Sequence, residues 1–258
     1  MNKIHPTALV SPKAKLGDNI EVGPFAIIYD DVEIGNDCRI GPSAVIYDGA
    51  RIGNRVKIFQ SAAISNVPQD LKFGNEKTYF HIGDDTVIRE FATLHRGTVE
   101  TGESRIGKNC LMMAYTHVAH DVQIGDNCII ANSVQIAGHI TIEDWVIIGG
   151  GTLIHQFGRI GQHAMVGGGL RVHMDVPPYI IAMDSPARFA GLNVIGLRRR
   201  GFTDEEIGTL KEAYKILYES GLNISQGREK LETEFRDSPL IQNITGFILN
   251  SQRGLIKK

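Results

Sequence analysis

An aliphatic residue recurs at every sixth position through the first two thirds of the sequence. From Ile4 to Val172 each sixth residue is Ile, Val, Leu or Met, and the only exceptions are Asp70, Glu76 and Glu100. Gly, Asn and Asp, which tolerate sharp bends, occupy many of the positions between them. A period of six is a signature of β-helices, in which each unit buries its aliphatic side chain only against stacked neighbours. The sequence therefore predicts a mainly β protein built around a parallel β-helix.

Two stretches keep the six-residue frame but lose the aliphatic residues that define it. They cover about residues 66–80 and 98–105. We expect both to leave the coil as loops, because a repeat without its aliphatic side chain adds nothing to the core. Loops held by a rigid scaffold commonly carry function, so substrate contacts are expected in the first loop, which contains Asp70 and Lys72.

The six-residue period ends shortly after Pro177-Pro178, and a helical pattern follows it. We therefore predict two domains, a β-helix over 1–185 and a small α-helical C-terminal domain over 186–258. Strand edges at the open end of a β-helix lack partners, and a helical domain is suited to cover them.

The C-terminal domain is predicted to contain three helices. Thr203 and Glu206 have the spacing of a capping box, which opens a helix that ends near Ser220. A second helix is expected over about 225–236. A third is expected over about 238–254, because a Ser-Pro pair favours a helix start and a glycine favours its end.

Composition narrows the choice of partners. The 258 residues carry a formal net charge of −2, so no overall positive field attracts nucleic acid or an anionic membrane. No apolar run has the length of a signal peptide or a membrane-spanning helix. We predict a cytoplasmic protein with no nucleic-acid partner and no stable membrane insertion. Three cysteines are too few for a disulfide framework, and we expect them to be small buried residues.

The six-residue pattern resembles that of the hexapeptide-repeat transferases. The resemblance implies a left-handed parallel β-helix with triangular turns, each containing three strands and about 18 residues. Residues 18 apart then lie on successive turns at roughly the 4.8 Å spacing of neighbouring strands. On this lattice His120 lies beneath the backbone of Gly138.

A histidine beside an exposed backbone N–H provides the minimum needed for acyl transfer. The imidazole takes a hydroxyl proton, and the N–H stabilises the oxyanion. Asp121 follows His120 and is suited to orient its imidazole. An aspartate is equally expected at this position as an ordinary corner residue. Such chemistry requires no metal ion.

Several motifs make the resemblance more specific. They are Leu94-His95-Arg96-Gly97-Thr98-Val99, His117-Val118-Ala119-His120-Asp121, Ala137-Gly138-His139, Ile154-His155-Gln156-Phe157 and Arg199-Arg200-Gly201-Phe202. Together they resemble the UDP-N-acetylglucosamine O-acyltransferases of lipid A biosynthesis, and the likeness extends over nearly the whole chain. The resemblance implies a homotrimer with active sites in the clefts between subunits.

The reaction that the resemblance implies is transfer of an (R)-3-hydroxyacyl group from acyl carrier protein to the glucosamine 3-hydroxyl of UDP-N-acetylglucosamine. No cofactor is implied beyond the phosphopantetheine that carries the acyl group. His120 matches the catalytic base, Asp121 its orienting partner and the Gly138 N–H the oxyanion donor.

Further positions match substrate contacts in the family. Those around the sugar and its phosphates are Asp70, Lys72, His95, His117 and His139. Those on the nucleotide or carrier side are His155, Gln156, Asn193, Arg199 and Arg200. Gly168 matches the residue that limits acyl length, and a glycine there implies room for a long chain.

Three alternatives stay open. Residues 183–186 depart from the family pattern, so the acceptor is either the N-acetylglucosamine hydroxyl or the amine of the 3-amino sugar analogue. His117, His120 and His139 are candidates for a zinc site like that of carbonic anhydrases on this fold, although the motifs favour the acyltransferase without a metal. A non-catalytic repeat scaffold is the third, and the concentration of histidines beside the loops argues against it.

Overall fold

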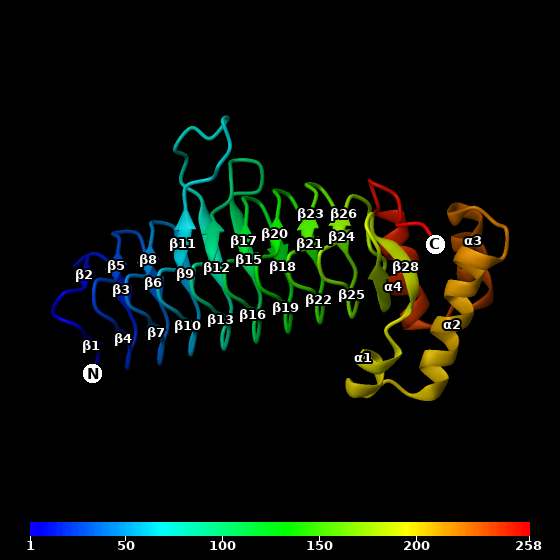
Figure 1. Ribbon diagram of the computed structural model, residues 1–258, viewed down its shortest axis with the longest axis horizontal. Helices are drawn as coiled ribbons and strands as arrows, with labels where there is room; N and C mark the ends of the chain where they lie inside the picture. The colour runs from blue at the N-terminus through cyan, green and yellow to red at the C-terminus, as the bar shows by residue number, and fades with distance from the viewer.

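The computed structural model describes residues 1–258 and contains 28 β-strands followed by four helices. Most strands have two residues. Along the coil, each strand pairs with the third strand after it in the chain, as β1 does with β4 and β4 with β7. Three parallel sheets therefore form the faces of a coil, which runs from the N-terminus to the helical domain at the opposite end (Figure 1). The parallel β-helix predicted from the six-residue period is confirmed.

Each sheet collects strands from successive turns. The first sheet consists of β1 (Lys3–Ile4), β4 (Glu21–Val22), β7 (Arg39–Ile40), β10 (Lys57–Ile58), β13 (Val87–Ile88), β16 (Leu111–Met112), β19 (Ile129–Ile130), β22 (Ile147–Ile148), β25 (Met165–Val166), β27 (Ile180–Met183) and β28 (Arg188–Leu192). The second consists of β2 (Leu9–Val10), β5 (Ile27–Ile28), β8 (Val45–Ile46), β11 (Ala63–Asn66), β14 (Thr93–His95), β17 (His117–Val118), β20 (Gln135–Ile136), β23 (Leu153–Ile154) and β26 (Arg171–Val172). The third consists of β3 (Lys15–Leu16), β6 (Glu33–Ile34), β9 (Ala50–Ile52), β12 (Tyr79–Ile82), β15 (Glu103–Ile106), β18 (Gln123–Ile124), β21 (Thr141–Ile142) and β24 (Arg159–Ile160).

The aliphatic residues of the repeat fill the inside of the coil. Ile46, Ile64 and Ile136 are fully buried, whereas Ile4 on the open first turn remains 44% exposed. Burying one such side chain stabilises the fold by about 1.5–3 kcal/mol, so stability comes from the whole stack. The same core continues into the helical domain through residues such as Leu197 and Tyr214.

Two loops leave the coil on the same side, where Figure 1 shows them projecting between the second and third sheets. The first lies between β11 and β12 and covers 67–78, and the second lies between β14 and β15 and covers 96–102. They are shorter than the predicted intervals, because Tyr79 and the residues from Glu103 onward already pair within the third sheet.

The loops lengthen two turns of the coil without disturbing the six-residue frame. Most strand pairs join residues 18 apart, as Ile4 and Val22 do. The step from Ile58 to Ile88 is longer by 12 residues, and the step from Ile88 to Met112 is longer by 6. Because the length of each insertion is a multiple of six, the aliphatic residues after each loop still fall at every sixth position counted from Ile4.

The β-structure extends beyond the predicted domain boundary at 185/186. β28 pairs antiparallel with β27 and forms a hairpin that ends the first sheet. The last strand of the coil region therefore reaches Leu192, because the chain turns back at residues 184–187 instead of entering a helix.

The C-terminal domain contains α1 (Val194–Arg199), α2 (Asp204–Glu219), α3 (Ile224–Glu234) and α4 (Pro239–Leu249). The capping box of Thr203 and Glu206 is present at the start of α2, as predicted. The prediction missed the short α1 and placed the end of the last helix too late. α4 ends at Leu249, and the chain after it runs back to the coil, where Asp175 pairs with Leu255.

Polar contacts attach the helices to the last turn of the coil. The Tyr214 hydroxyl donates to the Pro178 carbonyl over 2.5 Å, and the Ser251 hydroxyl donates to the buried carboxylate of Asp175 over 2.6 Å. These bonds give partners to polar groups that would otherwise be buried without any. They also attach the helical domain to the end of the coil, which it covers as a cap. None of the four helices combines the length and apolarity that a membrane crossing requires.

Candidate active site

Most of the predicted site residues lie along one edge of the coil. We call this the His120 edge, and it comprises the turns and loops that lead from the second sheet to the third. The predicted residues at or beside it are Asp70, Lys72, His95, His117, His120, Asp121, Gly138, His139, His155 and Gln156. Both loops belong to this edge, so the repeat lattice brings segments far apart in the sequence to one line.

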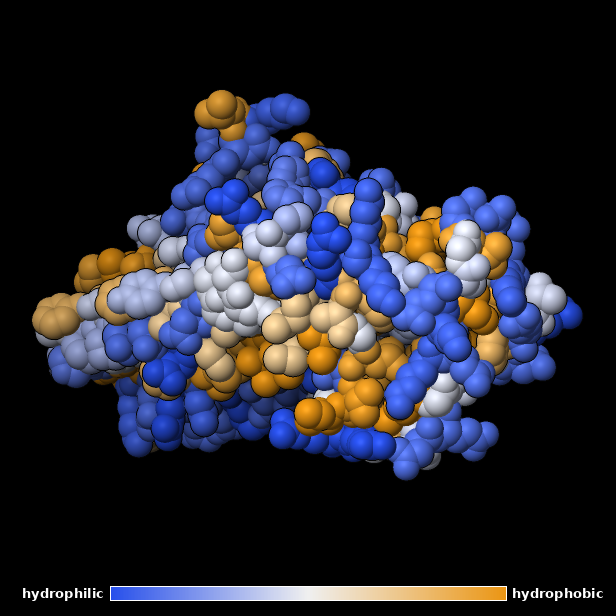
Figure 2. All heavy atoms as spheres, turned by 45° about the vertical axis from the view of Figure 1, so that its right-hand side comes forward, coloured by the Kyte–Doolittle hydropathy of each residue, from blue (hydrophilic) through white to orange (hydrophobic).

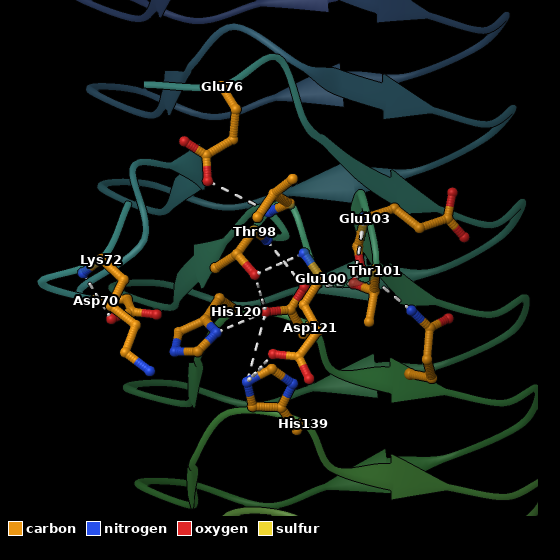
Figure 3. A network of polar contacts seen from close by, with 12 residues as sticks. Asp70, Lys72, Glu76, Thr98, Glu100, Thr101, Glu103, His120, Asp121 and His139 are labelled. Atoms are coloured by element: carbon orange, nitrogen blue, oxygen red, sulfur yellow. Dashed lines mark hydrogen bonds and ion pairs between the residues drawn. The ribbon is translucent and has the colours of Figure 1, made fainter. Parts of the chain in front are cut away.

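His120 and Asp121 form a hydrogen-bonded pair at this edge (Figure 3). The imidazole Nδ1 lies 2.7 Å from the Asp121 Oδ2, and the side chain of His120 is 15% exposed while that of Asp121 is fully buried. Burial alone would raise the pKa of Asp121, but hydrogen bonds from Thr101, His120 and Thr98 outweigh it and hold the pKa below its usual value. The pair therefore consists of an ionised carboxylate behind a partly accessible imidazole.

Gly138 packs directly against the ring of His120. A Cβ atom at Gly138 would lie 2.8 Å from Cε1 and 3.0 Å from Nε2 of His120, so no other residue fits without displacing the imidazole. The Gly138 N–H donates to no acceptor of the chain, whereas its carbonyl accepts from the Phe157 N–H. The predicted stacking of these two positions is confirmed, and a free backbone donor lies next to the histidine.

His139 lies on the next turn and encloses the pair from one side. Its ring meets the His120 ring edge-on at a centroid distance of 5.0 Å and stacks on Phe157 at 4.6 Å. Its Nε2 lies 3.8 Å from the Asp121 Oδ2 and 3.7 Å from the Glu100 Oε2. His139 thus has a fixed orientation between two carboxylates.

His95 and His117 form a second pair of rings beside the first, with centroids 5.1 Å apart. The His95 Nδ1 lies 2.6 Å from the Val67 carbonyl, which only accepts, so this nitrogen carries the proton. Burial, followed by the nearby His95, lowers the pKa of His117 to about 4. His117 is therefore neutral near pH 7, and its Nδ1 pairs with the Thr93 hydroxyl at 2.8 Å.

Asp70 and Lys72 lie on the first loop, which projects above the histidines. The Lys72 backbone N–H donates to the Asp70 Oδ1 over 3.0 Å, which fixes the turn between them. The Lys72 ammonium group is exposed and forms no ion pair in the chain. Lys72 therefore places an unpaired positive charge on the loop beside the histidines.

Comparison with known proteins identifies the family. The family described as "Udp N-acetylglucosamine O-acyltransferase; Domain 2" matches residues 175–256, and bacterial transferase hexapeptide repeats match 13–48, 31–61 and 103–138. An acyl-[acyl-carrier-protein]--UDP-N-acetylglucosamine O-acyltransferase from Chlorobium phaeobacteroides is 60% identical over 255 residues, covering 98% of this chain and 97% of the relative. The chain belongs to this acyltransferase family.

Other relatives agree with this assignment. The acyltransferase of the same description from Chlorobaculum parvum is 55% identical over 98% of this chain and 97% of its own length. Among solved structures, a UDP-N-acetylglucosamine acyltransferase from Bacteroides fragilis is 47% identical and superposes with a TM-score of 0.96 over 98% of this chain and 100% of the other. The predicted membership and the left-handed β-helix that it implies are therefore confirmed.

The remaining predicted residues of this acyltransferase lie on other edges of the coil. Gly168 is in the turn from the first sheet to the second. Asn193, Arg199 and Arg200 lie beyond β28, near the turns from the third sheet to the first. One chain alone thus distributes the predicted site over three edges.

Two of these residues already have partners within the chain. The Asn193 amide donates to the His163 carbonyl over 3.0 Å, and its oxygen accepts from the Gly196 N–H as the cap of α1. The Arg200 guanidinium lies 3.2 Å from the His163 Nδ1 and 5.3 Å from the centre of the Trp145 ring. Arg199 is exposed and forms no ion pair.

The acyltransferase brings one set of potential metal ligands together. His120, Asp121 and His139 each offer an atom within 4.8 Å of the others. His117, the third histidine of the zinc alternative, is not in this set, and its Nδ1 pairs with Thr93. The Asp121 Oδ2 already accepts from His120 and from Thr98, which leaves it little capacity for a cation.

The sequence did not identify the partners of Asp121. Thr98 and Thr101 in the second loop contact its carboxylate, and Glu76 in the first loop accepts from the Val99 N–H over 3.3 Å. The only available signal was that Glu76 and Glu100 interrupt the aliphatic frame. Such an interruption marks a loop, but it does not show which loop residues turn back toward the coil.

Proposed function

We propose that this acyltransferase transfers an (R)-3-hydroxyacyl group from acyl carrier protein to the 3-hydroxyl of UDP-N-acetylglucosamine, the first step of lipid A biosynthesis. The relatives named above support the two substrates. The observation that carries the mechanism is the placement of His120, which is held by the Asp121 carboxylate and packed against the backbone of Gly138.

His120 is the general base of the proposed reaction. Its Nδ1 is committed to an ionised carboxylate, so the proton lies on Nδ1 and the Nε2 lone pair is available. Nε2 takes the proton of the sugar hydroxyl while the oxygen attacks the thioester carbonyl carbon. The resulting oxyanion accepts a hydrogen bond from the Gly138 N–H, the C–S bond breaks, and the imidazolium returns the proton to the departing thiolate.

The other residues of the His120 edge are suited to bind the nucleotide sugar. Lys72 offers an unpaired ammonium group for the phosphates, and Asp70 lies beside it in the first loop. His95, His117 and His139 offer neutral or fixed ring nitrogens around the sugar. His155 and Gln156 are exposed one turn further along, toward the nucleotide or carrier.

We also propose a homotrimer in which neighbouring subunits complete each site. Gly168, Arg199 and the His120 edge lie on different edges of one chain, so a single subunit does not join them. A hollow of about 540 Å³ in the chain, lined by Arg51, His81 and Arg105 among others, contains none of the site histidines. A cleft between subunits satisfies both observations.

The outer surface of the first sheet supports association between copies. Its early strands β1 to β10 place Lys3, Glu21, Arg39 and Lys57 outward. The later strands β13 to β25 place Val87, Leu111, Ile129, Ile147 and Met165 outward. Figure 2 shows exposed apolar side chains along the coil in orange. A continuous apolar stripe of this kind is typical of a protein interface, and sedimentation at the monomer mass would contradict the trimer.

Three further points belong to the same proposal. The acyl group arrives on the phosphopantetheine of acyl carrier protein, so the reaction uses no cofactor or metal ion of the protein itself. Both substrates belong to cytoplasmic metabolism, which supports a cytoplasmic location. Gly168 is exposed and lacks a side chain, which supports a pocket for a long acyl chain.

Mass spectrometry of the product tests the proposed reaction. The purified protein is incubated with UDP-N-acetylglucosamine and a mixture of (R)-3-hydroxyacyl carrier-protein thioesters of different lengths. We expect an ester on the sugar, formed preferentially from the longer thioesters. Product only with the 3-amino sugar would replace the acceptor, since residues 183–186 depart from the family pattern. Product with neither sugar would overturn the proposed function.

A further inference from the structure

The second loop folds back over Asp121 and supplies it with donors (Figure 3). The Thr98 N–H donates to Oδ1 over 2.9 Å, and the Thr98 hydroxyl donates to Oδ2 over 2.8 Å. The Thr101 hydroxyl also contacts Oδ1, and the His120 Nδ1 contacts Oδ2. Each carboxylate oxygen therefore has two partners, and three of the four come from the loop.

This arrangement has a chemical consequence for Asp121. A carboxylate surrounded by donors has no free direction for a proton of its own, and the side chain is fully buried. The Thr98 hydroxyl accepts from the Glu100 N–H, so its own proton is directed at the carboxylate. The Thr101 hydroxyl also lies 2.8 Å from the Glu103 carbonyl, but the ionised carboxylate is the stronger acceptor.

We propose that Thr98 and Thr101 are positioning residues, whose hydroxyls hold the Asp121 carboxylate in place and share its charge so that His120 stays a correctly oriented base. This inference rests on the proposed role of His120. Neither threonine forms a hydrogen bond with His120, so both act through Asp121.

The hydroxyls also limit how strongly the carboxylate stabilises an imidazolium. A carboxylate with four donors spreads its charge over four hydrogen bonds, whereas one that has lost a hydroxyl concentrates more charge on His120. Loss of either hydroxyl therefore favours the protonated ring, which is not a base. It also frees the carboxylate to rotate, and the imidazole rotates with it.

The two loops are connected through the same segment. The Glu76 carboxylate accepts from the Gly74 N–H in the first loop over 2.6 Å and from the Val99 N–H in the second loop over 3.3 Å. Val99 is next to Thr98, so the first loop, which also contains Lys72, supports the cage around Asp121. One chain of hydrogen bonds thus connects the loop that carries Lys72 with the carboxylate that orients His120.

The test compares Thr101→Val with Thr101→Ser, together with Thr98→Val. Valine keeps the shape and removes the hydroxyl, and serine restores it. We expect Thr101→Val to lower kcat about tenfold, with the KM for UDP-N-acetylglucosamine within about twofold of the parent. We expect the acidic limb of the kcat profile to move to higher pH by about half a unit, and serine to restore both values. Thr98→Val follows the same direction.

Two controls keep the result interpretable. Thr209→Val removes an exposed helix hydroxyl that donates only to the Glu205 carbonyl, so kcat and the pH profile stay unchanged. Thermal unfolding of each variant shows whether the fold persists. If both valine variants keep the parental kcat and acidic limb, the positioning role is wrong. If they lose activity but serine does not restore it, the hydroxyl is not the cause. An active His120→Ala variant would overturn the proposed base itself, independently of the threonines.

Discussion

His120 and His163 lie in corners on two different edges of the same coil, one position apart within the six-residue repeat, and their surroundings are opposite. His120 faces a buried carboxylate on one side and the bare backbone of Gly138 on another. His163 lies in the turns from the third sheet to the first, the His163 edge, where its ring stacks between Trp145 at 6.1 Å and Tyr179 at 5.7 Å. A place in a corner of the coil therefore does not by itself decide what a histidine does.

The charged neighbour separates the two roles. The Asp121 carboxylate accepts a hydrogen bond from the His120 ring and places a negative charge beside it. At the His163 edge burial, followed by the guanidinium of Arg200, lowers the pKa of His163 to about 4. His163 is therefore a neutral packing residue at pH 7, and Phe202 meets its ring edge-on at a centroid distance of 5.0 Å. A base requires a stabilising anion together with open space.

The strongest test of this comparison is to substitute each histidine in turn. His120→Ala removes the proposed base, and we expect kcat to fall about a thousandfold, within the range of general-base catalysis, with an unchanged unfolding temperature. His163→Gln removes an aromatic packing partner, and we expect a lower unfolding temperature with kcat within about threefold of the parent. Steady-state kinetics and thermal unfolding of both variants distinguish the roles. The reverse pattern, an inactive His163→Gln and an active His120→Ala, would mean that His163 is the base and His120 is not.

A smaller effect is expected from filling the space beside His120. The Cβ of Gly138→Ala would lie 2.8 Å from the imidazole Cε1, which is too close for any unstrained contact. The ring moves instead of the backbone, because the turn is held by the bonds of its neighbours to the adjacent turns. We expect kcat to fall about a hundredfold while the protein stays folded.

Gly208→Ala is the matched control for that substitution. Gly208 lies in α2, where an added Cβ meets no atom within 4 Å. The change keeps activity and stabilises the helix by up to about 1 kcal/mol. If Gly138→Ala has full activity, the ring is not held against the backbone in the working enzyme, and the proposed oxyanion position is wrong.

The sequence was sufficient to predict the coil because the aliphatic residues of the repeat are the residues that the coil buries. Each aliphatic position contacts the one above and below it, so the frame from Ile4 to Val172 specifies the core. The stacking of His120 and Gly138 followed from the same frame, since no insertion lies between them. The count of turns did not follow. Cys38 lies three turns from Cys110, not the four that 18-residue steps imply, because the two loops lengthen the intervening turns.

The parts that the sequence did not predict depend on non-repeating contacts. Thr98 and Thr101 reach Asp121 only because the second loop folds back over the edge. β28 extends the first sheet because residues 184–187 form a turn, which the end of the six-residue pattern does not reveal. The position of Arg200, at the end of α1, depends on the contact of its guanidinium with Trp145, and no periodicity describes that contact.

Arg200 offers the next test, with a moderate expected effect. The resemblance places it on the nucleotide or carrier side, whereas the chain already uses its guanidinium against Trp145 and His163. Arg200→Met keeps most of the stem and removes the charge. If the stacking contact dominates, we expect about 2 kcal/mol less stability in urea unfolding, with KM within about twofold of the parent. A large rise in KM with unchanged stability would instead support a ligand contact.

The last expected effect concerns the pH dependence of stability. The pKa of His163 is about 4 in the folded protein, below its ordinary value of 6.5, so the unfolded chain binds one more proton between these values. Stability is then complete above about pH 6.5 and falls as the pH decreases toward 4, by at most about 1.4 kcal/mol per pH unit. His117, whose pKa is also about 4, contributes in the same direction. Urea unfolding between pH 4 and pH 7 should therefore show a shallower slope for His163→Gln than for the parent. Equal slopes would mean that His163 already binds a proton in the folded state, and that a buried cation sits beside Arg200 without a balancing anion, which would remove the contrast with the His120 edge.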